Sequence, residues 1–254
     1  MRNPSFPAAI ALPSAIALCL FSLGLPLTAQ DVPTHAPDGG TRQTLASIDI
    51  PPTTNAPFTA TVVTEWTRIL PDGSSQIIKN HRTVARDGAG RVFQERRTFS
   101  PTGDQQETTL SELDYVDPYR HELSICNPQT QVCLVHKYNA PPVIDLSKSG
   151  ALSNGTGSVI REDLGRHTLE GLDLIGSREI TTLKAGVEGS AKAEQTIKEF
   201  WYSPQLSINV LTRRIDPHAS AIQNFTVKNI TLENPDPKLF EPPADYRIVK
   251  IDAQ

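Results

Sequence analysis

The sequence has few of the residues and motifs that usually mark catalytic or membrane function. Its 254 residues include three cysteines and one methionine, and no apolar run beyond residue 29 approaches the eighteen or so residues that a membrane span needs. It lacks a phosphate-binding Walker loop, a dinucleotide fingerprint and the Gly-x-Ser-x-Gly elbow of many hydrolases. No segment carries a clear 3.6-residue apolar period, so long helices are not expected. We therefore nominate no catalytic residue, no cofactor and no metal.

The N-terminus is predicted to be a secretory signal peptide covering residues 1–29. Arg2 precedes an apolar run, Ala8–Leu27, and Leu27-Thr28-Ala29 supplies small residues for cleavage before Gln30. Prolines interrupt the run, which argues against a stable membrane-spanning helix. The mature protein is therefore expected to be periplasmic or secreted, with no transmembrane segment after cleavage.

Charge and cysteine content agree with an exported protein that does not bind nucleic acid. Residues 1–29 contain one basic residue and no acidic one, so the formal net charge of −4 becomes −5 after cleavage. Mild acidity argues against nucleic-acid partners. Only Cys126 and Cys133 remain after cleavage, and two cysteines outside the cytosol are most simply one disulfide.

The remaining pattern predicts a mainly β protein: one antiparallel, strongly curved sheet forming an unclosed half-barrel, with few or short helices. Residues 30–56 are rich in proline, glycine and threonine and are expected to be a flexible leader, apart from a short edge strand at Leu45–Ile50. Residues 57–250 are expected to form one antiparallel β domain. Its C-terminal part shows the most regular rhythm of strand and turn, with strands at Thr196–Tyr202, Ser207–Ile215 and Ile222–Leu232.

Phe58–Leu70 and Gln76–Arg86 are predicted to form a hairpin around Pro71-Asp72-Gly73. If Leu70 opposes Ser74, the partners are Ala60 with Val84, Glu65 with Lys79 and Trp66 with Ile78. Period-two alternation then places Phe58, Val62, Trp66 and Ile78 on one face. This face is either plain core packing or the wall of an apolar ligand site, and its four residues are the candidate ligand-binding residues.

A second hairpin is predicted within Arg120–Tyr138, with Cys126 bonded to Cys133 across the turn. In that register Glu122 faces Lys137, a favourable charge pair. His121 and His136 lie on one face as diagonal neighbours. Two imidazoles can share a metal, but no third ligand is evident, so two histidines at a sheet surface is the preferred interpretation.

Several short motifs in the last quarter of the chain carry a family resemblance. One of them, the apolar pair Leu239-Phe240 between two proline blocks, is also expected to pack against the sheet as a plug rather than to form a strand. The motifs are Trp201-Tyr202-Ser203-Pro204, Val210-Leu211, Arg214, Asp216-Pro217, Asn229-Ile230, Pro235-Asp236-Pro237, Leu239-Phe240 and Pro243-Ala244-Asp245-Tyr246. They resemble the closing strands of uncharacterised exported proteins of soil bacteria, and more distantly the outer-membrane lipoprotein carrier superfamily, LolA-like and LppX-like.

The resemblance implies an unclosed half-barrel that holds acyl chains in its concavity. It thus favours an exported, non-enzymatic binding protein whose partner is a lipid or a lipoprotein. Carriers of this kind begin with a helix and cover the concavity with mid-chain helices, whereas the corresponding segments here are rich in proline, glycine and serine. The alternative is an envelope interaction or scaffold module without a small-molecule ligand, and a hydrolase is the third interpretation.

Overall fold

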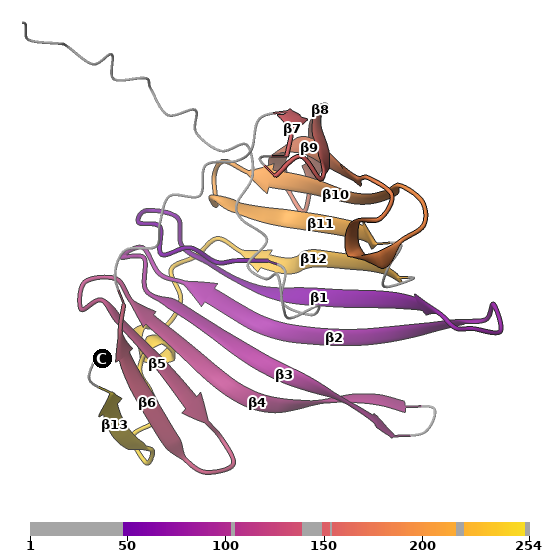
Figure 1. The fold of residues 1–254 in the computed structure, drawn as a ribbon. Helices are drawn as coiled ribbons and strands as arrows, with labels where there is room; N and C mark the ends of the chain where they lie inside the picture. The colour runs from indigo at the N-terminus through magenta and orange to yellow at the C-terminus, as the bar shows by residue number, and fades with distance from the viewer. Residues whose placement is uncertain (1–47, 103–104, 139–148, 153, 217–220, 252–254) are drawn as a thin grey trace, which may run out of the picture. The chain divides into compact units, whose positions relative to one another are not determined.

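The computed structural model describes residues 48–102, 105–138, 149–152, 154–216 and 221–251 (Figure 1). The described residues contain thirteen strands and two 3-10 helices. The strands are β1 Phe58–Ile69, β2 Ser75–Arg86, β3 Val92–Thr102, β4 Gln105–Asp117, β5 Glu122–Asn127, β6 Val132–Lys137, β7 Gly150–Ala151, β8 Gly157–Leu169, β9 Leu172–Leu183, β10 Glu194–Ser203, β11 Ile208–Asp216, β12 Ala221–Thr231 and β13 Arg247–Ile251. The helices are η1 Val187–Gly189 and η2 Pro237–Phe240.

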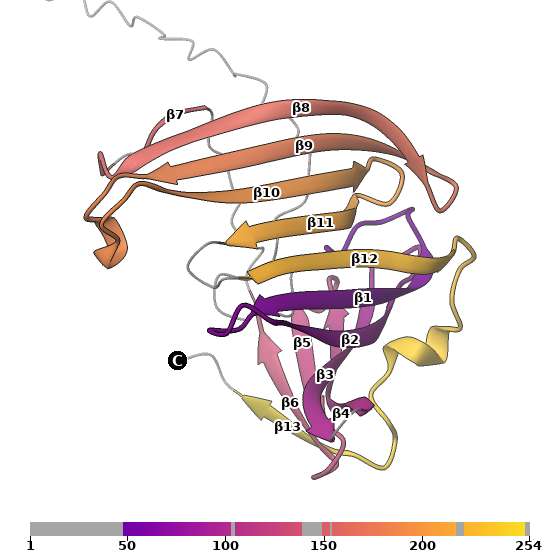
Figure 2. The ribbon, with the colours of Figure 1, turned by 90° about the vertical axis from the view of Figure 1, so that its right-hand side faces the viewer.

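All thirteen strands belong to one sheet that is not closed. Its order is β13-β6-β5-β4-β3-β2-β1-β12-β11-β10-β9-β8-β7. The chain runs outward from β1 to β6, continues at the opposite edge with β7, and returns inward until β12 pairs with β1 (Figure 2). The predicted fold class, a mainly β unclosed half-barrel, is therefore confirmed.

Several elements differ from expectation. β13 pairs parallel with β6, so the sheet is mixed rather than wholly antiparallel. This five-residue strand has no apolar alternation strong enough to reveal it. β8 continues as one strand through a bulge between Asp163 and Gly165, where the glycine alone would suggest an interruption.

The β1–β2 hairpin has the predicted register. Ala60 opposes Val84, Glu65 opposes Lys79, and Trp66 opposes Ile78. The Leu70 amide donates to the Ser74 carbonyl at 2.8 Å. Gly73 takes φ +82°, and the Asp72 carboxylate accepts a 2.9 Å bond from the Ser74 amide. Local turn chemistry therefore sets this register.

The β5–β6 hairpin also has the expected register. Cys126 opposes Cys133 and the two are bonded. Glu122 opposes Lys137, with 2.9 Å between the Glu122 Oε1 and Lys137 Nζ atoms. The disulfide lies in a small core with Ala85, Phe93 and Tyr115.

We call the sheet face that carries Phe58, Val62 and Thr64 the inner face, and the face that carries Glu65 and Thr67 the outer face. Directly opposed residues of neighbouring strands share a face, so each register row can be followed across the sheet. On the inner face, Phe58, Val62, Val84, Phe225 and Val227 belong to the main core.

The end of the expected leader packs onto this core. Ile48 and Ile50 are buried among the residues of the main core, although neither is in a strand. Residues 45–47 of the edge strand expected at Leu45–Ile50 lie outside the described residues. The Arg82 Nη2 atom donates to the carbonyl oxygen of Ile48 at 2.5 Å, which ties this segment to β2.

The plug predicted at Leu239-Phe240 is confirmed. Asp236 caps the N-terminus of η2, and its carboxylate accepts a 3.0 Å bond from the Lys238 amide. The last residue of η2, Phe240, is buried against Phe93, Tyr115 and the disulfide. Phe93 and Tyr115 are neighbours of Ala85 on the outer face of β2–β4, so η2 covers that part of the outer face.

Candidate binding site on the inner face

The four predicted ligand-binding residues share the inner face but differ in accessibility. Phe58 and Val62 are 0% and 1% exposed, and Ile48 and Ile50 pack against the same core. Ile78 is 6% exposed. The protein's own leader segment therefore occupies the space beside Phe58 and Val62, and a ligand would contact them only after displacing that segment.

Trp66 lies farther along β1 and is only half-buried. The Arg68 guanidinium carbon lies 5.1 Å from the centre of its ring, which is cation–π geometry. The Trp66 Nε1 atom is buried, and no described residue accepts a hydrogen bond from it. A buried indole N–H usually finds an acceptor, so this end of the inner face has an unused donor.

A pocket of about 240 Å³ lies on β8 and β9. It is lined by Arg161, Glu162, Asp163, Ile175, Gly176, Ser177, Arg178 and Glu179. Register places five of these side chains on the inner face, because Asp163 opposes Ser177, Ser177 opposes Phe200, and this row continues through Thr212 and Phe225 to Thr64. The five are Arg161, Asp163, Ile175, Ser177 and Glu179.

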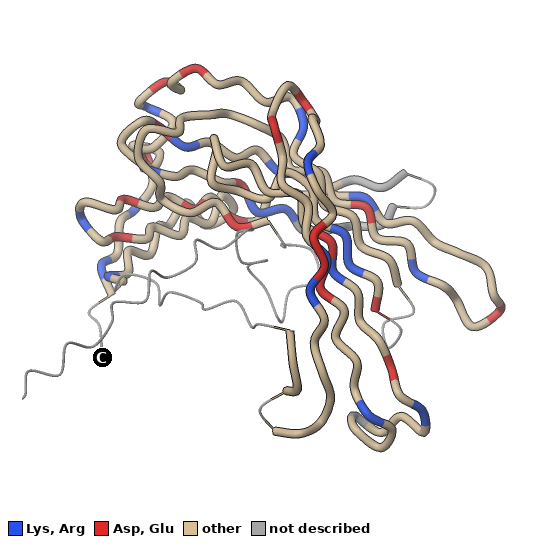
Figure 3. Tube along the Cα trace, turned by 90° about the horizontal axis from the view of Figure 1, so that it is seen from above, with Lys and Arg blue, Asp and Glu red and all other residues tan. Residues whose placement is uncertain are grey.

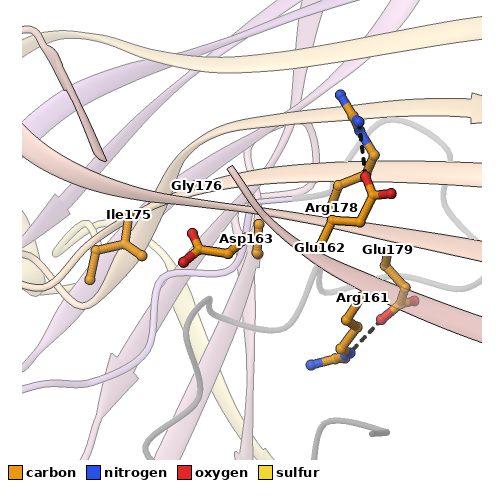
Figure 4. Close-up of a pocket in the computed structure, with 8 residues that line it drawn as sticks. Arg161, Glu162, Asp163, Ile175, Gly176, Arg178 and Glu179 are labelled. Carbon is orange, nitrogen blue, oxygen red and sulfur yellow. Dashed lines mark hydrogen bonds and ion pairs between the residues drawn. The ribbon is translucent and has the colours of Figure 1, made fainter. Parts of the chain in front are cut away.

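Ion pairs lie on opposite sides of this strand pair. On the inner side, the Arg161 Nη2 and Glu179 Oε2 atoms are 2.8 Å apart. On the outer side, Arg178 bonds Glu162 at 3.0 Å and Glu199 at 2.8 Å. Figure 4 shows the Arg161–Glu179 pair on the side of the strands away from the Arg178–Glu162 pair. The same two strands therefore carry a matched inner and outer arginine.

Two polar atoms at the inner side of the pocket are buried without a partner among the described residues. They are the Arg161 Nε atom and the Ser177 hydroxyl. Thr212, two strands away in the row of Ser177, also has a buried hydroxyl with no described partner. Unsatisfied buried polar groups are rare in native proteins. The inner face between β8 and β11 thus offers hydrogen-bonding capacity that the described chain does not use.

A second polar cluster on the inner face has a structural explanation. Arg82 is buried and donates to Gln94 Oε1 at 2.5 Å, while Arg96 donates to Asp114 Oδ2 at 2.8 Å. Burial, with a smaller effect of the nearby Arg96, lowers the pKa of Arg82 to about 10, so Arg82 remains charged at neutral pH. Burial also raises the pKa of Glu112 to about 7, with a contribution from the neighbouring Asp114. Because Arg82 also holds Ile48, we assign this cluster to anchoring the leader segment.

Of the two histidines considered as metal ligands, His136 opposes Leu123, as the predicted register requires. His121 precedes β5 with φ +52°, and the centre of its ring lies 5.8 Å from that of Tyr138. Within the described ranges no group of three metal-ligating side chains is assembled. The preferred interpretation of two surface rings therefore stands as a prediction.

Sequence reasoning did not find the residues of the β8–β9 pocket. Arg161 and Ser177 become neighbours only through the β8–β9 register, and that register changes at the bulge before Gly165. Arg161, Glu162 and Asp163 are charged at successive positions, so the sequence pattern does not identify which face is inner.

Comparisons with known proteins give a distant structural likeness. No family model matches the chain, and no curated protein matches it. Among solved structures, an uncharacterised conserved protein from Thermus thermophilus matches with TM-score 0.40 and 11% identity over 78% of this chain and 91% of that one. MucB matches with TM-score 0.39 and 12% identity over 76% of this chain and 60% of that protein.

A LolA superfamily protein from Nitrosomonas europaea matches with TM-score 0.29 and 11% identity, over 74% of this chain and 91% of that one. The resemblance inferred from the C-terminal motifs is confirmed as a distant one. TM-scores of this size carry no information about ligands. None of the described helices is long and apolar enough to cross a membrane.

Proposed function

We propose that this protein is an exported, non-enzymatic binding protein that holds a lipid, or an acyl chain of a lipoprotein, against the inner face of its sheet. The observation that carries the proposal is the inner-face pocket on β8 and β9, where Ile175 lies beside polar atoms without a described partner. Apolar contact with a few convergent polar groups is typical of small-molecule sites. The unclosed half-barrel supports the same role, since it provides a broad inner face.

The size of the pocket limits what it can hold. A water molecule occupies about 30 Å³ of liquid, so about 240 Å³ accommodates roughly eight water-sized groups. This is too small for a whole acyl chain. The pocket would therefore receive one end of an amphiphile, with the remainder extending past Ile175 outside the pocket.

Two isoleucines of β9 provide a matched test. Ile175 points to the inner face and lines the pocket, whereas Ile180 lies on the outer face, and both are half-buried. Titration with a fluorescent apolar probe should show binding to the wild type and a loss of about tenfold in affinity for Ile175→Gln, since one apolar contact is worth about 1–3 kcal/mol. Ile180→Gln should bind like the wild type. The proposal is wrong if the wild type binds no apolar probe, or if both variants lose affinity equally.

Export is tested separately. With residues 1–29 removed, the mature chain should begin near Gln30 or Asp31 and carry no lipid. N-terminal sequencing of protein recovered from the native envelope or medium would contradict this if it returned Met1 or an acylated cysteine.

The outer face favours a second candidate function, an envelope interaction module that works by self-association. One register row of this face consists of Ile160, Ile180, Ile197, Ile215, Ile222, Thr67 and Ile77 across seven strands. Its two end residues, Ile160 and Ile77, are 51% and 47% exposed. A parallel row two residues away consists of Glu162, Arg178, Glu199, Arg213, Asn224, Glu65 and Lys79. Figure 3 shows basic and acidic positions side by side on neighbouring strands.

The two ends of the charged row are complementary to each other, whereas Arg213 at its centre would face its own copy. A second copy turned by half a turn about an axis through Arg213 would bring Glu162 opposite Lys79 and Arg178 opposite Glu65. The same rotation would bring isoleucine opposite isoleucine along most of the apolar row. Isologous dimers require this kind of self-complementary patch.

The test for self-association is a charge exchange. The double variant Glu65→Lys, Lys79→Glu keeps the in-chain pair, whose atoms are 3.4 Å apart in the wild type, but places like charges opposite Glu162 and Arg178 of the second copy. Sedimentation equilibrium should show a dimer for the wild type and a monomer for this variant. A monomeric wild type at all concentrations, or a dimeric double variant, would reject this candidate.

A further inference from the structure

The charged side chains on the inner side of the β8–β9 pocket balance one another, and this balance limits which ligand head groups the pocket can bind. Arg161 and Glu179 form one ion pair, Asp163 adds a second carboxylate, and Lys198 lies directly opposite Glu179 on β10. Two cationic and two anionic side chains therefore leave no net formal charge on this part of the inner face. A ligand with its own full charge would meet like charges as well as opposite ones and would lose its hydration.

The unused polar atoms include both a donor and a group that can donate and accept. The Arg161 Nε–H is a donor only, and the Ser177 hydroxyl can both donate and accept. Nearby acceptor capacity comes from the carboxylates of Glu179 and Asp163. Asp163 Oδ1 already accepts a 2.7 Å bond from the Gly165 amide, which leaves Oδ2 as its other acceptor oxygen. A partner for this set must accept from Arg161 and donate to a carboxylate at the same time.

Hydroxyl groups meet this requirement because each both donates and accepts a hydrogen bond. A carboxylate or phosphate head accepts only, and a quaternary ammonium head can do neither. The volume of about 240 Å³ admits the few heavy atoms of a glycerol unit and leaves little room for a larger head. We propose that the β8–β9 pocket binds the uncharged, hydroxyl-bearing head of a glycerol-type amphiphile, with Arg161 and Ser177 as its specificity-determining residues.

This inference rests on the proposed function and specifies the chemical class of its ligand. In the bound complex the Arg161 Nε–H donates to one head-group hydroxyl, and that hydroxyl donates to the carboxylate of Glu179 or Asp163. The Ser177 hydroxyl forms a hydrogen bond with the neighbouring head-group hydroxyl. The acyl chain leaves the pocket past Ile175 along the inner face.

The test compares three amphiphiles with the same dodecyl-length chain on the mature full-length protein. Monolauroylglycerol has an uncharged hydroxylated head, laurate an anionic head and dodecyltrimethylammonium a cationic head. Each is titrated against a bound fluorescent apolar probe, below its micelle concentration. A hydrogen bond to a charged group is worth about 1.5–3 kcal/mol, so monolauroylglycerol should displace the probe at about ten- to hundredfold lower concentration than the other two.

Variants of the pocket residues test whether the preference for monolauroylglycerol arises in the pocket. Ser177→Ala and Arg161→Gln should each reduce the preference for monolauroylglycerol by about tenfold while the affinity for the apolar probe changes little. Arg178→Gln removes the outer arginine of the same strand pair and should keep the full preference. Ser177→Ala removes a single oxygen, so it remains informative if Arg161→Gln fails to fold.

The possible outcomes distinguish a failure of the head-group inference from a failure of the proposed binding function. Probe binding with equal displacement by all three amphiphiles, or tighter binding of laurate, overturns the head-group inference and leaves the binding function intact. An undiminished preference in Ser177→Ala also overturns the inference, because the selection would then arise elsewhere. Absence of any probe binding by the wild type overturns the proposed function, and the head-group inference with it.

Discussion

Replacing Arg86 by methionine tests the account of how the leader segment is held on the sheet. Arg86 is fully buried at the end of β2, directly opposite Phe58, and its guanidinium carbon lies 5.1 Å from the centre of the Phe58 ring. Its Nε donates to the Ala56 carbonyl at 3.0 Å, its Nη1 to the Pro51 carbonyl at 2.8 Å, and its Nη2 to the Leu206 carbonyl. One side chain thus joins β2, the leader and the β10–β11 turn.

Two opposing effects determine how much unfolding free energy the Arg86→Met variant loses. Burial lowers the pKa of Arg86 to about 10 from 12.5, so keeping it charged in the folded state costs on the order of 3 kcal/mol. Methionine removes that cost and fills most of the volume. It also leaves three carbonyl groups without their donor, at about 1–3 kcal/mol for each one that stays buried. The hydrogen-bonding effect is larger, and we expect a net destabilisation of about 3 kcal/mol.

Urea unfolding followed by tryptophan fluorescence and far-ultraviolet circular dichroism measures this loss. Arg213→Met is the control, since Arg213 is on the outer face with a side chain 43% exposed and lies 4.0 Å from Glu199. Its unfolding free energy should change by no more than about 0.5 kcal/mol. If Arg86→Met were as stable as the Arg213→Met control, the three carbonyl bonds would not hold the leader and the reasoning would be wrong.

Three further predictions concern the disulfide, the contact between Gly176 and Trp201, and the inner polar cluster. Intact-mass analysis of the exported protein should find no free thiol, and Cys133→Ser should cost about 2 kcal/mol, because the loop between Cys126 and Cys133 is short; two free thiols would contradict the pairing. Gly176→Ala should destabilise the fold by about 1–3 kcal/mol and shift Trp201 fluorescence, because a Cβ atom at Gly176 would lie 2.7 Å from the Trp201 ring; an unchanged midpoint and spectrum would show that the ring moves freely. The raised pKa of Glu112, about 7 in the folded state against 4.5, means that the folded protein binds the proton more tightly, so this group contributes stability below about pH 4.5 that is lost as pH rises through about 7. Relative to Glu112→Gln, the wild type should therefore become less stable between pH 5 and pH 8, and parallel pH profiles of the two proteins would refute the assignment.

The local features of the fold were readable from the sequence because short-range chemistry determines them. Pro71-Asp72-Gly73 defines a turn, and period-two alternation on either side leaves one register that buries Phe58 and Val62 together. The β5–β6 register follows from the cysteine pair and from the opposition of Glu122 and Lys137. In both hairpins the partners are fewer than thirty residues apart, so the turn and the side-chain pattern specify the same pairing.

Long-range pairing and the candidate site were decided by the tertiary structure. The sequence does not specify that β12 pairs with β1, or that β13 joins β6 in parallel, because many strand orders satisfy the same alternation. The sequence suggested an edge strand for Ile48 and Ile50, yet they lie outside any strand and occupy the inner face beside Phe58, where Arg82 and Arg86 bind the leader's carbonyls. Arg161 and Ser177 read as ordinary polar positions of two strands. Only the β8–β9 register, with its bulge before Gly165, places their unsatisfied atoms on one face of one pocket, because a shift of β8 by one residue would have turned Arg161 to the other face.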